Sequence, residues 1–176
     1  EKIVSVQTQT EIRAVTREDA ASIGQIYCAA WKETYRGLLP QDYLDSLSSE
    51  RWKKQYAVSP PTALALWEDG KLVGVVSYHQ GRQEKLSDWG EVGSLYLLPC
   101  CWKKGYGSRL LREALSRLSQ MGYKQVYLWV LQGNRRAIAF YEREGFSFSG
   151  DRLETYIGGQ RVTELRYIRN GNPNTF

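Results

Sequence analysis

One segment of the chain limits the possible folds more than any other. Residues 90–98 (GEVGSLYLL) are an apolar run typical of a buried strand, and Pro99 ends it. A short loop follows, and Gly105 then begins a segment in which apolar residues recur every three or four positions, as on the buried face of a helix. Residues 123–130 again have strand character. This order predicts a parallel strand–helix–strand crossover in an α/β sheet.

Alternation, helical spacing and turn residues predict the elements on either side of this segment. Asp69-Gly70 and Gly158-Gly159 are typical of hairpin turns. The expected strands are residues 11–15, 63–67, 71–79, 90–98, 123–130, 146–157 and 160–168. The expected helices are residues 17–31, 41–47, 48–56, 105–121 and 134–144. We therefore expect a mixed sheet with helices on both faces, in one domain over residues 1–170 with a tail over 171–176.

The composition excludes several classes of protein. With 176 residues and 42% apolar side chains, the chain can bury a core without disulfide or metal staples. Its three cysteines form no disulfide framework, which favours a reducing compartment, the cytoplasm. One histidine and no C-x-x-C pair cannot build a zinc site, so no metal is expected. No apolar run reaches the roughly 18–20 residues of a membrane span, and the first residues lack the apolar region of a signal peptide.

The net charge of +5 leaves two kinds of polyanionic partner to consider. Nucleic-acid binding uses clustered Lys and Arg side chains, whereas a small polyanion needs a few local cations and backbone amides. No basic run in this chain exceeds two residues. A mildly basic, solvated surface is therefore the simplest interpretation, and we expect neither a nucleic-acid nor a membrane partner.

The start of the predicted helix at Gly105 has the properties of a phosphate-binding site. The first backbone N–H groups of a helix lack internal partners, and the helix dipole adds a partial positive charge. Gly105 and Gly107 let a ligand approach the backbone where a Cβ would collide, and Lys103 and Lys104 add charge. A diphosphate suits such a site, although a plain glycine turn before a helix has the same pattern. Neither the dinucleotide fingerprint nor the P-loop is present, because no third glycine and no G-K-[ST] follow.

At this loop the sequence resembles a known family, the GNAT acyl-CoA N-acyltransferases. Their pyrophosphate loop, [QR]-x-x-G-x-[GA], follows a strand that ends in an apolar–aromatic–apolar triplet and a proline. Here the triplet is Leu95-Tyr96-Leu97, and the loop is Trp102-x-x-Gly105-x-Gly107, with Trp in place of Gln or Arg. The family's downstream motif is matched by Asn134-x-x-Ala137-x-x-x-Tyr141-x-x-x-Gly145-Phe146. The resemblance covers about residues 11–168.

The resemblance implies the detailed fold and the cofactor. It implies a mixed, mostly antiparallel sheet of six or seven strands, of the α/β (α+β) class, with helices on both faces. The central strands, one ending at Leu97 and one following Tyr123, would splay apart to admit the pantetheine arm of acetyl-CoA. The residues expected to bind this cofactor are Leu95, Tyr96, Leu97, Trp102, Lys103, Lys104, Gly105, Tyr106, Gly107, Ser108 and Asn134.

The implied activity is transfer of acetyl from acetyl-CoA to a primary amine of a small molecule or peptide, by direct attack in a ternary complex. Tyr141 stands where the family places its general acid, although an aromatic residue that packs the helix onto the sheet fits the position too. Glu91 lies fourteen residues before Gly105, the offset of the catalytic glutamate in the histone-acetylating branch of the family. It is our candidate general base, and the alternative is a solvated glutamate at the edge of a strand.

Two further expectations concern the strand before the loop. Alternation would place Glu91, Gly93, Leu95 and Leu97 on one face of the sheet. A backbone N–H near Leu97 or Leu98 would stabilise the carbonyl oxygen of the thioester.

Aromatic residues mark a candidate acceptor pocket. Trp31 and Tyr35 are four residues apart, as are Trp52 and Tyr56, so each pair would share a helix face. Either pair would hold an amine by cation–π contact or pack in the core. His79, at the end of a strand beside the expected cleft, is a candidate base or substrate contact, or an ordinary hydrogen-bonded histidine. Residues 30–40 resemble a stretch found in some small bacterial acetyltransferases.

Other functions stay open at this point. A CoA-binding regulatory or interaction module without catalysis would keep the same cofactor loop. A nucleic-acid binder would use the positive charge instead, and its affinity would fall steeply with salt. An acyl-cysteine route through Cys100 or Cys101 needs a partner that forms the thiolate, and the sequence shows none. A homodimer is a further expectation, by analogy with relatives.

Overall fold

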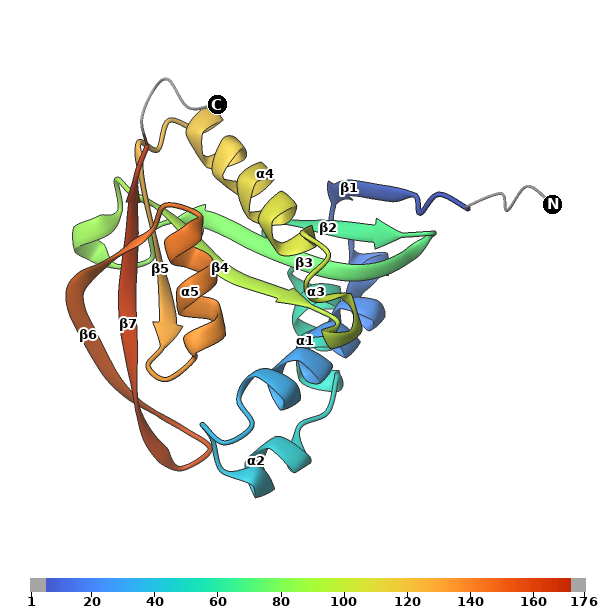
Figure 1. Cartoon of the computed structure of the whole chain (residues 1–176), viewed down its shortest axis with the longest axis horizontal. Helices are drawn as coiled ribbons and strands as arrows, with labels where there is room; N and C mark the ends of the chain where they lie inside the picture. Colours follow the sequence, from blue (N-terminus) through green and yellow to red (C-terminus); the bar gives the residue numbers. More distant parts are fainter. Residues whose placement is uncertain (1–5, 172–176) are drawn as a thin grey trace.

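The computed structural model describes residues 6–171 and contains a seven-stranded sheet flanked by helices (Figure 1). The strands are β1 (Thr10–Ala14), β2 (Ala63–Glu68), β3 (Lys71–Gln80), β4 (Gly90–Leu97), β5 (Gln125–Leu131), β6 (Ser147–Ile157) and β7 (Gln160–Asn170). The helices are α1 (Ala20–Thr34), α2 (Gln41–Ser46), α3 (Glu50–Val58), α4 (Tyr106–Gln120) and α5 (Arg135–Arg143). Short 3-10 turns lie at Arg17–Asp19, Glu84–Leu86 and Pro99–Cys101. The predicted elements are all present, with ends that differ by a few residues.

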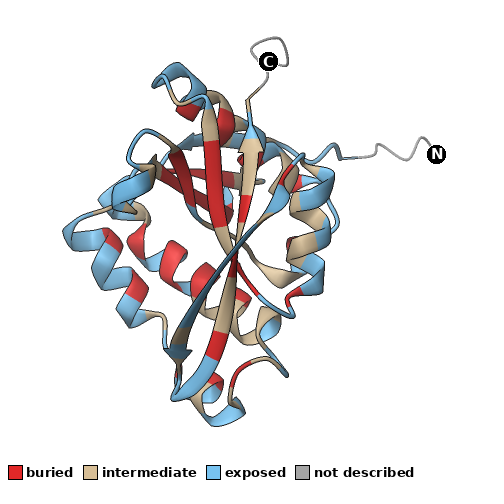
Figure 2. Ribbon diagram, turned by 90° about the vertical axis from the view of Figure 1, so that its left-hand side faces the viewer, coloured by how far each residue is buried: buried red, intermediate tan, exposed pale blue. Residues whose placement is uncertain are grey.

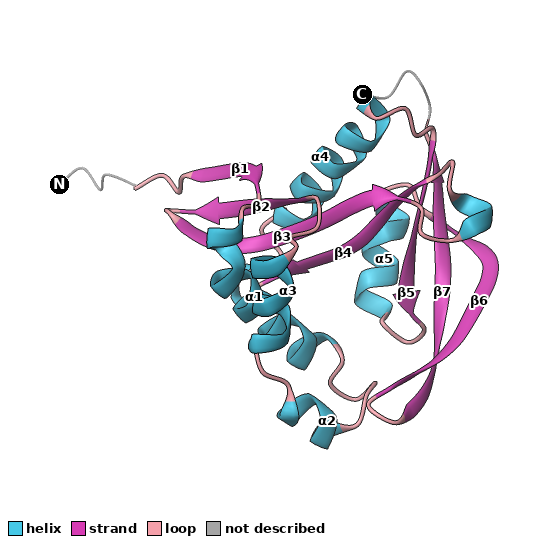
Figure 3. Ribbon diagram, turned by 180° about the vertical axis from the view of Figure 1, so that it is seen from behind, coloured by secondary structure: helices cyan, strands magenta, loops and turns pink. Residues whose placement is uncertain are grey.

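The sheet is mixed and mostly antiparallel, in the order β1-β2-β3-β4-β5-β7-β6. Every neighbouring pair of described strands is antiparallel except β4 and β5, which run parallel. This parallel pair is joined at Gly90–Val126 and at Glu91–Tyr127, and beyond these residues the two strands diverge (Figure 3). The predicted fold class, with its splayed central pair, is therefore confirmed.

Helices cover the two faces of the sheet and enclose two apolar clusters. On one face, α4 packs Leu110, Leu111 and Leu118 against the central strands, and all three are fully buried. Residues of α5 lie beside them. On the other face, α1, α2 and α3 cover β2 and β3. Burial of each such leucine stabilises the fold by about 1.5–3 kcal/mol. Figure 2 shows the buried residues along the central strands and inner helix faces, whereas the edge strand β6 is mostly exposed.

A bulge in β4 changes which side chains share a face. Tyr78 of β3 opposes Val92, but Ser77 opposes Ser94, so Gly93 is an extra residue without a partner on β3. The expectation that Glu91 lies on the face of Leu95 and Leu97 is therefore wrong. The bulge moves Glu91 to the opposite face, because one inserted residue reverses the alternation.

Two further expectations concern the ends of the chain and membranes. Within residues 6–171, no helix is long and apolar enough to cross a membrane. The predicted tail over 171–176 lies outside the described residues from position 172 onward.

Candidate active site

A cavity of about 640 Å³ lies where β4 and β5 diverge. Its lining includes residues 92–97 of β4, 128–131 of β5, 105–108 at the start of α4, and parts of α5. Ala30 and Thr34 of α1, and Tyr35 directly after it, close one side. Of the eleven residues expected to bind the cofactor, all except Lys104 line this cavity. One continuous space thus connects the glycine loop to the gap between the strands.

The start of α4 presents its first backbone amides without a side-chain cap. Gly105 takes the N-cap position in a left-handed conformation, with a φ of 81°, and no side-chain hydrogen bond caps the helix. Lys103 is also left-handed, with a φ of 64°, which turns the loop sharply before the helix. Uncapped N–H groups and the helix dipole together attract an anion. The geometry therefore suits a phosphate group at residues 105–108.

Trp102 replaces the motif's Gln or Arg and has partners that the sequence did not indicate. Its indole Nε1 donates to the carbonyl oxygen of Leu97 at 3.3 Å. The guanidinium of Arg136 stacks on the ring, 3.5 Å from its centroid, which is a close cation–π contact. Both side chains line the cavity, so a positive charge lies at its wall although position 102 is aromatic.

Lys104 points away from the cavity. Its Nζ lies 3.0 Å from Oε2 of Glu68 at the end of β2, and the hydroxyl of Tyr106 donates to the same carboxylate. The hydrogen bond from Tyr106, followed by that from Lys104, lowers the pKa of Glu68. The expectation that Lys104 binds the cofactor is corrected here, because this contact fastens the loop to β2 instead.

Tyr141 projects from α5 into the cavity. Its ring packs against Phe140 and Phe146, with centroids 5.2 and 5.8 Å away, and its hydroxyl makes no hydrogen bond to any described residue. Burial raises the pKa of Tyr141, so the hydroxyl keeps its proton at neutral pH. Tyr141 thus packs against its aromatic neighbours, and its role as a proton donor stays a prediction.

Asn134 begins α5 and reaches the same cavity. Its Oδ1 accepts a hydrogen bond from the backbone N–H of Ala137 at 3.3 Å, which is the N-cap arrangement that the sequence predicts. Asn134 is buried and lines the cavity, and its contact with the cofactor stays a prediction.

The backbone of β4 offers donors to the gap between the strands. The N–H of Leu98 is already bonded to the carbonyl oxygen of Val73 at 2.9 Å, which rules Leu98 out as the donor to the thioester. Because successive N–H groups of a strand point to opposite edges, the N–H of Leu97 faces the edge toward β5. Leu97 is thus the better placed of the two expected donors.

The two aromatic pairs occupy different surroundings. Trp52 and Tyr56 are buried in the core beneath α1, as the packing interpretation predicts. Tyr35 lines the cavity, where its hydroxyl lies 3.1 Å from that of Tyr96. Trp31 packs edge-on against Tyr35, and its buried indole N–H has no hydrogen-bond partner among the described residues. Tyr35 is therefore the member of the two pairs that reaches the candidate site.

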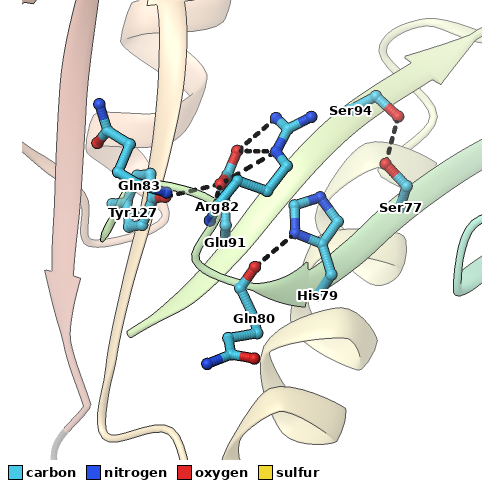
Figure 4. Close-up of polar contacts among 8 residues, drawn as sticks. All are labelled: Ser77, His79, Gln80, Arg82, Gln83, Glu91, Ser94 and Tyr127. Atoms are coloured by element: carbon cyan, nitrogen blue, oxygen red, sulfur yellow. Dashed lines mark hydrogen bonds and ion pairs between the residues drawn. The ribbon is translucent and has the colours of Figure 1, made fainter. Parts of the chain in front are cut away.

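Glu91 is held in a network on the other side of β4 (Figure 4). Its carboxylate lies 2.5 Å from Nη2 of Arg82 and accepts hydrogen bonds from the hydroxyl of Tyr127 at 2.7 Å and the backbone N–H of Arg82 at 3.1 Å. Burial acts to raise the pKa of Glu91, but the hydrogen bonds from Arg82 and Tyr127 outweigh it, so the pKa is lowered. Burial and the hydrogen bond to Glu91 also raise the pKa of Tyr127 to about 12.

This environment does not suit a general base. The carboxylate of Glu91 is buried rather than solvated at a strand edge, its oxygens are already engaged, and a lowered pKa weakens its affinity for a proton. Among the residues that the structure describes, the cavity lining includes neither Glu91 nor His79. We therefore correct the assignment of Glu91: it is a structural anchor for the segment that follows β3.

We expect Glu91→Gln to destabilise the protein by about 1–3 kcal/mol at neutral pH, because a charge-assisted pair with Arg82 is lost. The lowered pKa of Glu91 means that its contribution is complete above the ordinary glutamate value of about 4.3 and is lost as the pH falls through the lowered value. Urea unfolding at about pH 7 and about pH 3 measures this. The difference in the free energy of unfolding between wild type and Glu91→Gln should be smaller at about pH 3 than at about pH 7. A difference of the same size at both pH values contradicts the assignment.

Comparison with known proteins places this fold and cavity in a family. A model of the acetyltransferase (GNAT) family matches residues 22–146. The chain therefore belongs to the GNAT family and is an acyl-CoA-dependent N-acetyltransferase, as the two motifs predict.

Relatives and solved structures agree with this family. The chain is 28% identical over 172 residues to the N-acetyltransferase YuaI of Bacillus subtilis, an alignment that covers 90% of this chain and 98% of that protein. It is 25% identical over 166 residues to the spermidine N(1)-acetyltransferase of Thermoplasma acidophilum, covering 89% and 97%. The solved PaiA N-acetyltransferase of Thermoplasma acidophilum, in complex with coenzyme A, has the same fold. The TM-score between the two structures is 0.76, with 22% sequence identity, and the match covers 92% of this chain and 99% of the PaiA chain.

Proposed function

We propose that this protein transfers the acetyl group of acetyl-CoA to a primary amine by direct attack within a ternary complex. The observation that carries the proposal is the continuous cavity, which runs from the uncapped start of α4 to the gap between β4 and β5 and has Tyr141 in its wall. The residues present fit the cofactor: amides at 105–108 suit its diphosphate, and Leu97 and Asn134 face the space for its pantetheine arm.

One backbone group and one side chain would carry out the two steps that the thioester requires. When bound, acetyl-CoA supplies a thioester whose carbonyl carbon accepts the amine. The N–H of Leu97 would stabilise the negative charge that develops on the carbonyl oxygen. Tyr141 would donate its proton to the departing sulfur, since its raised pKa keeps that proton in place until the thiolate forms.

The acceptor amine is protonated at neutral pH and must lose a proton before its nitrogen can attack the thioester. An alkyl amine with a pKa of about 10.4 is neutral only about once in 2,500 molecules at pH 7, a cost of about 4.6 kcal/mol. A group that removes this proton is therefore useful, and Glu91 is not placed to do so. Tyr35 and Tyr96 would form part of the wall that the amine meets. Spermidine appears in the name of one relative, so a polyamine belongs in the first panel of acceptors.

The proposal is tested by release of free thiol from acetyl-CoA with a panel of amines, peptides and polyamines. We expect at least one amine to release thiol and to gain one acetyl group by mass spectrometry. Titration calorimetry with CoA is run beside it. Binding of CoA without turnover across a broad panel would favour a regulatory module and would contradict the proposal.

A further inference from the structure

The bulge in β4 places Gly93, a residue without a side chain, in the wall of the cavity. Gly93 has no partner on β3, is exposed and lines the cavity. A Cβ built on Gly93 would lie 2.7 Å from Nε2 of His79 and 3.0 Å from Oγ of Ser77. The tip of the imidazole therefore lies against bare backbone at the wall of the cavity, in the place that a side chain at 93 would fill.

The other ring nitrogen of His79 determines the state of this tip. Nδ1 lies 2.8 Å from the carbonyl oxygen of Gln80, which can only accept a hydrogen bond (Figure 4). Nδ1 must therefore carry a proton, and the neutral ring leaves a lone pair on Nε2, the nitrogen that faces Gly93. This tautomer is the one that a proton acceptor needs.

The carboxylate directly opposite His79 is already paired with other groups. Glu91 lies directly opposite His79 in the register of β3 and β4, and its carboxylate is engaged by Arg82 and Tyr127. On the same face of β4, the hydroxyl of Tyr27 from α1 lies 2.5 Å from Oγ of Ser94, and both groups are uncharged. The carboxylate that faces His79 across the two strands is thus already engaged and does not hold the proton that His79 takes.

We propose that His79 is the general base of this enzyme and takes the proton of the acceptor ammonium through one water at Gly93, because Gly93 lines the cavity while the imidazole lies just behind it. This inference rests on the proposed function. An ammonium N–H bond breaks and the proton moves to Nε2 of His79, which leaves a neutral amine. The amine forms a C–N bond with the thioester carbonyl carbon, and the C–S bond then breaks. Tyr141 protonates the thiolate and recovers the second proton of the attacking nitrogen, and His79 releases its proton to solvent.

The first test compares His79→Gln with Glu91→Gln in steady-state kinetics. Gln keeps hydrogen-bonding groups but cannot accept the proton, so we expect kcat to fall about 10²–10⁴-fold with an unchanged KM for acetyl-CoA. With an alkyl amine, the levelling-off of kcat/KM that an enzyme base produces should be absent in His79→Gln, where kcat/KM rises with pH toward the amine pKa of about 10.4, and it should persist in Glu91→Gln. A wild-type profile in His79→Gln, or the loss of the levelling-off in Glu91→Gln, would overturn the assignment.

The choice of acceptor sharpens the comparison. An aryl amine or an acyl hydrazide is already neutral at neutral pH, so it needs no base, and we expect His79→Gln to acetylate it at close to the wild-type rate. An alkyl amine of similar size should retain the full defect. Equal defects with both acceptors would assign His79 to structure rather than to proton transfer.

The variant Gly93→Ala tests the contact between Gly93 and the imidazole of His79 by changing Gly93 instead of His79. The new Cβ would displace the imidazole tip, since 2.7 Å is closer than such atoms approach. We expect the variant to lose turnover as His79→Gln does, and the double variant to lose no more than either alone. Additive losses would contradict a shared role.

A measurement without any acceptor keeps this inference separate from the proposed function. His79 is the single histidine of the chain, so its ring nitrogens give unambiguous ¹⁵N signals. We expect the proton on Nδ1 at neutral pH and a change in the Nε2 signal on addition of acetyl-CoA. A proton on Nε2, or no response to the cofactor, would refute the assignment even if the wild type acetylates amines. Absence of turnover with every amine would instead refute the proposed function, and His79 as its base would fall with it.

Discussion

Tyr141→Phe should lower kcat by about 10²–10⁴-fold while leaving the Kd for CoA nearly unchanged. The substitution removes only the hydroxyl, whose proton would go to the leaving thiolate. The ring remains, and with it the packing against Phe140 and Phe146 that holds α5 to the sheet. Thiol release measures the loss of turnover, and calorimetry with CoA measures binding.

The control for Tyr141→Phe is the same change at a tyrosine outside the cavity. Tyr123 follows α4 and packs against the core cluster of that face, so Tyr123→Phe removes a hydroxyl without touching the candidate site. It should retain wild-type turnover. If Tyr141→Phe also retains it, Tyr141 only packs the helix and another group protonates the sulfur.

Gly107→Trp should abolish binding of CoA, with a loss of affinity of at least about 100-fold, or about 2.7 kcal/mol. Gly107 is the second residue of α4 and lines the cavity beside the first amides of the helix. An indole at this position would fill the space in which the diphosphate meets those amides. Calorimetry gives the affinity, and circular dichroism verifies that the variant folds.

Gly107→Ala is the matched control. A Cβ there would lie 3.5 Å from Cδ1 of Leu97 and 3.6 Å from Cζ of Phe140, which are ordinary contacts, so the alanine fits without movement of its neighbours. Because the loop motif accepts Ala as well as Gly at this position, we expect this variant to bind CoA far more tightly than Gly107→Trp, even if the small Cβ reduces the affinity somewhat below that of wild type. If Gly107→Trp folds and binds equally well, the diphosphate lies elsewhere.

Much of the fold could be predicted because the pattern was local. The apolar stripe of α4, the hairpin turn at Asp69-Gly70 and the glycine loop before Tyr106 each follow from a few neighbouring residues. The ends of elements were less certain, because capping and pairing decide them together. Strand β5 begins at Gln125 rather than at 123, since the backbone N–H of Tyr123 still bonds to the carbonyl oxygen of Leu118 and completes the end of α4.

The candidate site was harder to predict because its contacts join distant parts of the chain. Nothing near Lys104 in the sequence indicates Glu68, and nothing near Glu91 indicates that Tyr127 would bind it. The bulge at Gly93 reversed the face assigned to Glu91, although a glycine inside a strand is a recognised sign of such irregularity. Ser94 and Arg136 were missed altogether, since each gains its place only through partners on other elements.

The short parallel pairing of β4 with β5 has a consequence for how the molecule is held together. The sheet is two smaller sheets, β1–β4 and β5–β7, joined by two rungs at Gly90–Val126 and Glu91–Tyr127. Past those rungs, the facing edges of β4 and β5 carry peptide groups that pair with no strand among residues 6–171. An extended ligand with amide groups of its own can form hydrogen bonds to both edges. The cofactor would then hold the two smaller sheets together as well as take part in the reaction.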